Sequence, residues 1–182
     1  IRAFDGQLVT GSEVVSPLVI DGNVAGDPKR DILKLVVLNR YQPSLPAVSF
    51  ITGFGLKQGA IASTVAHDSH NIVAVGADDD SLVRAINLVI ASKGGISAVD
   101  GRMEEVLPLP FAGIMSGSDG YGIASRYRIM DRHAKHMGSR LSAPYMTLSF
   151  MALLVIPELK LIDRGLFDGS AFQFTSLFSH DC

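Results

Sequence analysis

The residues in this chain that are best suited to chemistry lie in the nine-residue run Ser63–Asn71. Its order is Ser-Thr-Val-Ala-His-Asp-Ser-His-Asn, which places two imidazoles, one carboxylate, one carboxamide and three hydroxyls close together. Imidazole and carboxylate groups bind divalent metals and transfer protons near neutral pH. The candidate site residues are therefore Ser63, His67, Asp68, His70 and Asn71.

The spacing within this run is compatible with two local structures. In an extended segment Asp68 and His70 face the same side and His67 faces the other, so the pair could bind a metal or relay a proton. Three such side chains still fall short of a closed metal site. In a turn between two strands, Ser69 and Asn71 would instead hydrogen-bond the local backbone. The pattern alone leaves both interpretations open.

Two secondary candidates lie outside the run. Lys57 belongs to the glycine-rich stretch Gly53–Gly59, which has neither the phosphate-loop nor the dinucleotide-binding spacing. Such a stretch is more typical of a bulge or a tight turn, from which Lys57 could reach over a neighbouring site. Glu158 supplies a carboxylate near an expected strand end.

The remaining histidines carry weaker signals. His133 and His136 have helical i, i+3 spacing, but the arginines and the lysine around them favour a solvated face over a metal site. His180, Asp181 and Cys182 could form a ligand cluster, although terminal residues are usually mobile. The sequence contains no Gly-x-Ser-x-Gly elbow and no His-x-His pair, and its only cysteine is Cys182, so nucleophilic catalysis has no evident carrier.

The composition sets further limits. The 182 residues include 16 basic and 18 acidic side chains, so neither nucleic acid nor an anionic membrane is an expected partner. An apolar content of 47% predicts a sizeable packed core. A single cysteine fits a reducing cytoplasm, and the longest apolar stretch, Phe150–Pro157, is too short to span a bilayer.

The alternation of apolar residues with turn signals predicts the elements. Hairpin signals occur in residues 4–9 and 19–24, before a linker that ends at Asp27-Pro28. Expected strands are 32–39, 47–52, 59–66, 72–76, the hairpin 96–99 with 104–107, the apolar segment 147–156 and the final segment 172–178. Expected helices are 81–92, which starts at Asp78–Ser81, and about 121–137, which Asp119 caps.

Hairpin-length connections dominate this order of elements. Antiparallel or mixed strands with packed helices are the layers that such connections produce. The predicted fold class is therefore α+β.

Several segments together resemble one protein family. They are Gly53–Ile72, Leu107–Ser116, Pro144–Leu153, and Ile156–Leu161 with Asp163–Leu166. In this order, over about residues 31–178, the chain resembles the C-terminal domain of bacterial adenine deaminase, a member of the amidohydrolase superfamily. On this interpretation residues 1–30 are an exit segment from an upstream barrel, and residues 31–182 are the domain itself.

The resemblance implies an enzyme that hydrolyses adenine to hypoxanthine and ammonia. A divalent metal, manganese or iron and possibly zinc, would be held in a (β/α)₈ barrel upstream of this chain, where it activates water. The implied partners are adenine, water, the chain's own N-terminal barrel and further copies of the protein in a homo-oligomer. The metal ligands of that barrel are not expected in this chain.

Two expectations follow for the chain itself, and two alternatives stay open. Alone it should not deaminate adenine, and the run 67–71 should line or close the adenine site in the longer protein. A non-catalytic oligomerisation or regulatory module is the first alternative. A self-contained metal hydrolase that uses His67, Asp68, His70 and His180 is the second.

Overall fold

A six-stranded sheet forms the centre of the computed structural model, which describes residues 1–178. Each strand pairs antiparallel with its neighbours, in the spatial order β10-β9-β7-β8-β5-β6. The strands are β5 (Leu33–Leu38), β6 (Ala47–Ile51), β7 (Ala60–Ser63), β8 (Ile72–Gly76), β9 (Gly95–Asp100) and β10 (Met103–Pro108). All six were predicted, β7 as a longer strand than the structure forms.

Side-chain alternation along these strands produces two separate cores. In β5, Leu33, Leu35 and Val37 join the larger core on one face of the sheet, whereas Val36 joins the smaller core on the other face. Successive strand residues point to opposite faces, so a strand that is apolar at nearly every position must be covered on both sides.

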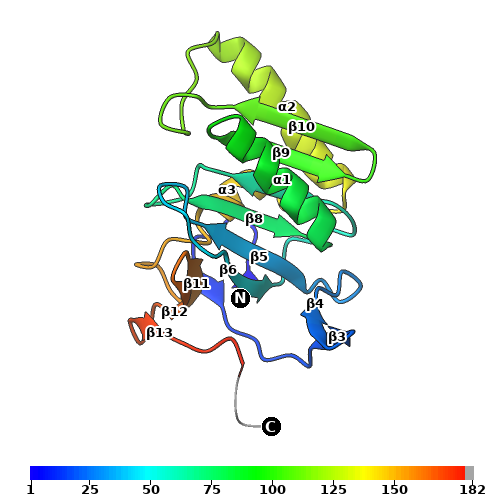
Figure 1. Ribbon diagram of the computed structural model, residues 1–182, viewed down its shortest axis with the longest axis vertical. Coiled ribbons are helices and arrows are strands. Elements are labelled where there is room, and N and C mark those ends of the chain that lie inside the picture. Colours follow the sequence, from blue (N-terminus) through cyan, green and yellow to red (C-terminus); the bar gives the residue numbers. More distant parts are fainter. Residues whose placement is uncertain (179–182) are drawn as a thin grey trace.

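Three helices provide that cover (Figure 1). Helix α1 (Asp79–Ala91) contributes Leu82, Ala85 and Val89 to the smaller core. Helices α2 (Gly120–His136) and α3 (Pro144–Ser149) pack on the opposite face. The predicted α+β class is confirmed. Within residues 1–178, none of the helices has both the length and the apolar character needed to cross a membrane.

The helix starts follow the predicted chemistry. The Asp78 carboxylate accepts a hydrogen bond from the Ser81 N–H at 2.7 Å, and Asp119 accepts one from the Gly122 N–H at 2.8 Å. Each aspartate satisfies one amide of a first turn that has no partner within its helix. Gly138, with φ of +118°, follows the end of α2.

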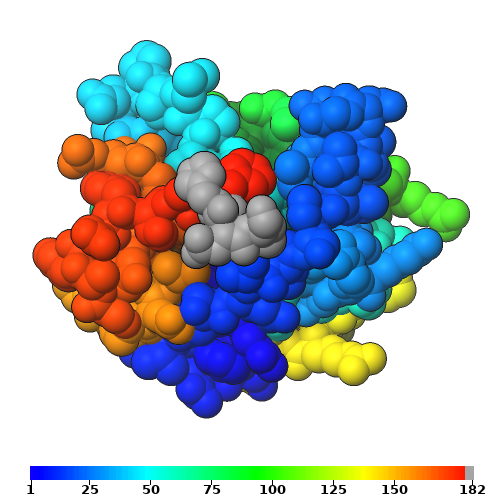
Figure 2. All heavy atoms as spheres, turned by 90° about the horizontal axis from the view of Figure 1, so that it is seen from below, coloured from blue at the N-terminus to red at the C-terminus, as the bar shows by residue number. Residues whose placement is uncertain are grey.

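The two ends of the chain form small sheets on one side of the molecule. Figure 2 shows residues 1–25 (blue) and the segment around residue 170 (orange to red) on one face. The strands are β1 (Arg2–Ala3), β2 (Thr10–Gly11), β3 (Leu18–Ile20), β4 (Asn23–Ala25), β11 (Leu159–Ile162), β12 (Gly165–Asp168) and β13 (Gln173–Phe174). Thr10 joins the two ends, because its hydroxyl donates to the Leu159 carbonyl at 2.7 Å.

Both N-terminal hairpin signals correspond to paired strands. β3 and β4 form the predicted hairpin around Asp21-Gly22. β1 and β2 flank residues 4–9, so the first signal marks the connection and the strands lie outside it.

Two predicted strands are wrong in kind or extent. The apolar segment 147–156 was expected as a strand, but it contains the end of α3 followed by turns. Short apolar runs are ambiguous between a buried strand and a buried helix, and here Pro144 occupies the first helical position. The final segment 172–178 forms a strand only at Gln173–Phe174.

Candidate functional site

Four connections meet at one end of the central sheet. They are residues 39–46 after β5, 64–71 after β7, 92–94 before β9 and 109–119 after β10. Antiparallel pairing brings them together, because the end of one strand lies beside the start of its neighbour. The end of α3 also reaches this region, since the His67 N–H donates to the Ser149 carbonyl at 2.9 Å.

The segment 64–71, called the site loop from here on, is a turn and not an extended strand. β7 ends at Ser63, residues 67–69 form the turn, and β8 begins at Ile72. The His70 N–H donates to the Ala66 carbonyl at 2.7 Å, which closes the turn, and His70 has a φ of 51°. The extended interpretation, with Asp68 and His70 alternating against His67, is therefore wrong. The turn was predicted by the other interpretation, and the Ser69 hydroxyl does accept from the local Asn71 N–H at 3.5 Å, but the Asn71 side chain bonds Arg40 and not its own backbone.

The turn brings the two imidazoles together. The rings of His67 and His70 lie 5.7 Å apart between centroids, and the His67 ring packs against Phe150 at 4.8 Å. The Ala66 N–H donates to Nδ1 of His70 at 3.3 Å. A neutral His70 therefore carries its hydrogen on Nε2, where it is a donor. Both histidines are half-buried, and Asp68 is exposed beside them.

Ser63 and Asn71 have a different role, because both are buried and bonded within the protein. The Ser63 hydroxyl accepts from the Val65 N–H at 2.9 Å, and the Asn71 Oδ1 accepts from the Arg40 N–H at 3.4 Å. They form the frame of the site loop. His67, Asp68 and His70 remain as the candidates with accessible functional groups.

The two secondary candidates are not brought to this end of the sheet. Lys57 lies between β6 and β7, at the opposite end, where its ammonium donates to the Pro28 carbonyl at 2.9 Å. Glu158 precedes β11, and its carboxylate accepts from the hydroxyl and the N–H of Ser12. Strand direction explains the separation of Lys57, because consecutive loops of an antiparallel sheet alternate between its ends.

The other histidine signals do not join the site loop. His133 is half-buried and His136 is exposed on α2. Within the described part of the chain, no three His, Cys, Asp or Glu residues come close enough to hold a metal ion. The residues present here thus do not fit the implied metal. The suggested cluster of His180, Asp181 and Cys182 lies outside the described residues.

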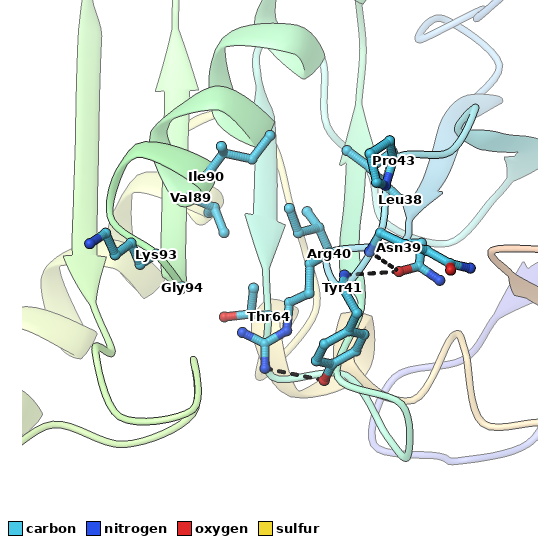
Figure 3. A pocket seen from close by; sticks show the side chains of 12 residues that line it. Leu38, Asn39, Arg40, Tyr41, Pro43, Thr64, Val89, Ile90, Lys93 and Gly94 are labelled. Carbon is cyan, nitrogen blue, oxygen red and sulfur yellow. Dashed lines mark hydrogen bonds between the residues drawn. The ribbon is translucent and has the colours of Figure 1, made fainter.

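The structure adds residues that the sequence did not single out. A cleft of about 510 Å³ lies beside the site loop, between α1 and the connection after β5. Figure 3 shows Arg40 and Tyr41 on one side of it, Val89 and Ile90 on the other, and Thr64 between them. The available signal was the polar sequence Asn39-Arg40-Tyr41 directly after an apolar strand, at the same sheet end as the site loop.

Comparison with known proteins decides the family. The sequence model of the family "Adenine deaminase C-terminal domain" matches residues 7–173, which is most of the chain. This chain belongs to the adenine deaminase C-terminal domain family. The resemblance noted from the sequence is confirmed.

Several curated adenine deaminases are similar over nearly the whole domain. Identity is 57% over 180 residues with that of Salinibacter ruber, covering 98% of this chain and 33% of the relative. It is 53% over 183 residues with that of Methanosarcina acetivorans, with 100% of this chain and 33% of the relative covered. The Methanothermobacter thermautotrophicus protein is 46% identical over 177 residues. The chain therefore spans about a third of the length of these relatives.

Proposed function

We propose that this chain is the C-terminal part of an adenine deaminase, in which the site loop forms one wall of the adenine site. The whole protein would catalyse the hydrolysis of adenine to hypoxanthine and ammonia. The relatives that share about half of the residues of this chain are named adenine deaminases, which supports that reaction.

The observation that carries the proposal is the convergence of three family-like segments on the site loop. The site loop belongs to the first of these segments. The second, Leu107–Ser116, meets it where the Thr64 hydroxyl donates to the Gly113 carbonyl at 2.6 Å. The third, Pro144–Leu153, meets it at Ser149 and Phe150, against the backbone and the ring of His67.

The accessible groups of the site loop suit the edge of a purine. A purine presents both donors and acceptors in its plane, and a small number of fixed polar groups is enough to orient it. His70 offers Nε2–H as a donor, and Asp68 offers carboxylate acceptors. The ring of His67, supported by Phe150, offers a flat surface beside them.

In this proposal the metal is bound by a different part of the protein from the site loop. A bound divalent cation would supply an activated water for hydrolysis. Because the described residues of this chain do not gather ligands for it, we assign the metal to the part of the protein that this chain does not include. The role of the chain is then to orient the base and to shield it from solvent.

The test uses a chimera in which this chain replaces the matching third of the Salinibacter ruber enzyme. Asp68→Ala and His70→Ala are each expected to lower kcat/KM for adenine by about 100-fold, the range of a well-placed polar or acid–base group. Thermal unfolding should be unchanged for Asp68→Ala, because Asp68 is exposed, and slightly lowered for His70→Ala, because His70 Nδ1 accepts from the buried Ala66 N–H.

The matched control is Asp80→Ala, which removes an exposed carboxylate at the other end of the sheet. It should leave kcat/KM unchanged. Unaltered kinetics in both site-loop variants would refute the proposal and assign the loop a purely structural role.

A further inference from the structure

Arg40 contacts the candidate region at several points. It follows β5 and lies next to Tyr41 at the sheet end where the loops meet. Its guanidinium donates through Nη2 to the Tyr41 hydroxyl at 3.2 Å and to the Ala112 carbonyl, and it lies over the Tyr41 ring at 4.9 Å.

The groups that contact the Arg40 guanidinium are neutral: the hydroxyl and ring of Tyr41 and the carbonyl of Ala112. None of the four ion pairs within residues 1–178 includes this residue. Its Nε is buried and has no hydrogen-bond partner among the described residues. A buried donor left unpaired costs free energy, so this position is not optimised for stability. Strained or unsatisfied groups of this kind gather at functional sites.

Gly113 is shaped to receive this guanidinium. Its φ of +75° belongs to the left-handed region that favours glycine, and a Cβ added there would collide with Nη1 of Arg40. A Cβ on Gly94 would in turn collide with the backbone of Gly113. The connection after β10 therefore packs closely against the Arg40 side chain, and the connection before β9 packs closely against Gly113.

Two contacts pass from this arrangement to the site loop. The Tyr41 hydroxyl donates to the Ser69 carbonyl at 2.8 Å, and the Arg40 N–H donates to the Asn71 Oδ1 at 3.4 Å. At the start of the loop, the Thr64 hydroxyl is bonded to the Gly113 carbonyl. The site loop is thus held at its start by Gly113, which packs against Arg40, and at its end by Arg40 and Tyr41.

We propose that Arg40 is a positioning residue that clamps the site loop to the connection containing Ala112 and Gly113, and so fixes His67, Asp68 and His70 for substrate. The inference rests on the proposed function for its catalytic consequence. The clamp itself is a property of this chain. A shift of about 1 Å in a positioned group can lower a rate about 100-fold, so a clamp remote from the chemistry can govern turnover.

The first measurement is hydrogen exchange of the His67 and His70 amides in the 182-residue chain. Arg40→Gln removes the guanidinium and should speed exchange of both amides at least about tenfold, because these amides become exposed to solvent whenever the site loop opens. Arg40→Lys keeps the charge, but its ammonium ends one bond short of the Nη2 position and has no planar group to lie over the Tyr41 ring, so exchange should remain fast. Gly113→Ala keeps residue 40 unchanged but displaces its guanidinium, so it should have the same effect. Arg164→Gln, which changes an exposed arginine beside Phe174, is the control that should change nothing.

The second measurement is turnover of adenine by the chimera carrying the same variants. Arg40→Gln should lower kcat at least about tenfold with a smaller change in KM, since the groups remain present but misplaced. Far-ultraviolet circular dichroism and the thermal midpoint establish that each variant is folded.

The outcomes separate the two proposals. Unchanged exchange in folded Arg40→Gln would overturn the clamp, and full recovery of slow exchange in Arg40→Lys would overturn the role assigned to the guanidinium. Faster exchange with unchanged turnover would confirm the clamp and refute the assignment of the site loop to the adenine site.

Discussion

At the scale of single residues, Lys160 combines a charge with a buried position. It lies in β11 with its side chain fully enclosed, and its ammonium donates to the Leu8 carbonyl at 2.7 Å. Burial lowers the pKa of Lys160 from 10.5 to about 8. Desolvation disfavours the charged form, and a single carbonyl acceptor offsets only part of that cost.

This residue predicts an alkaline rise in stability. Between pH 8 and 10.5 the unfolded chain keeps the Lys160 proton while the folded chain has lost it, so the free energy of unfolding should increase with pH. Below pH 8 both states hold the proton and this contribution is flat. Urea denaturation at about pH 7.5, 8.5 and 9.5 measures the increase in the free energy of unfolding.

Lys160→Met should remove most of that slope while preserving the apolar length of the side chain. The Ile1 amino group has its pKa lowered from 8.0 by burial, which gives the same sign at lower pH. It is present in both proteins and cancels in their difference. Tyr145 is also buried, and its raised pKa reverses the trend only above pH 10. Equal slopes in both proteins would contradict the assignment to Lys160.

At the scale of elements, the start of α1 depends on one side chain. Asp78 bonds the Ser81 N–H, whereas Asp79 pairs with Lys34 at 2.8 Å and Asp80 is exposed without such a contact. The helix covers β7, β8 and β9 through the smaller core, so loosening its first turn should be felt in the stability of the whole domain.

Asp78→Ala should therefore lower the free energy of unfolding by about 1 kcal/mol, the usual value of an N-cap hydrogen bond. Asp80→Ala removes a charge near the same helix end and should cost less than half of that. Chemical denaturation of both variants at one pH provides the comparison. Equal effects would show that charge, and not the cap, supports this end of the helix.

At the scale of the whole molecule, the chain matches only a third of the length of its curated relatives. Its described residues gather no metal ligands, and the candidate groups lie on a loop at one end of a sheet. Binding sites of enzymes often lie where two domains meet. An adenine site shared with the rest of a longer protein is the arrangement we propose.

The corresponding prediction concerns activity of the separate parts. The 182-residue chain alone, supplied with Mn²⁺, should release no ammonia from adenine, whereas the chimera with the Salinibacter ruber enzyme should do so. A coupled ammonia assay checks both. Metal-dependent deamination by the chain alone would overturn the proposal in favour of a self-contained hydrolase.

The sequence by itself determined the features that depend on neighbouring residues. The helix start within Asp78–Ser81, the hairpin around Asp21-Gly22 and the strand over residues 32–39 are local features, and each was predicted correctly. The family was also evident, because its segments appear in order along the chain. Local hydrogen bonds and side-chain periodicity act over only a few residues, so they are readable without a fold.

Only the tertiary structure decided which residues share a site. Arg40 and Gly113 lie far apart in the sequence yet pack together, whereas Lys57, much closer to His67 along the chain, lies at the opposite sheet end. The segment 147–156 forms the end of a helix followed by turns, although its apolar pattern is equally compatible with a strand. Strand order and direction set these proximities, and both depend on long-range packing that no local pattern encodes.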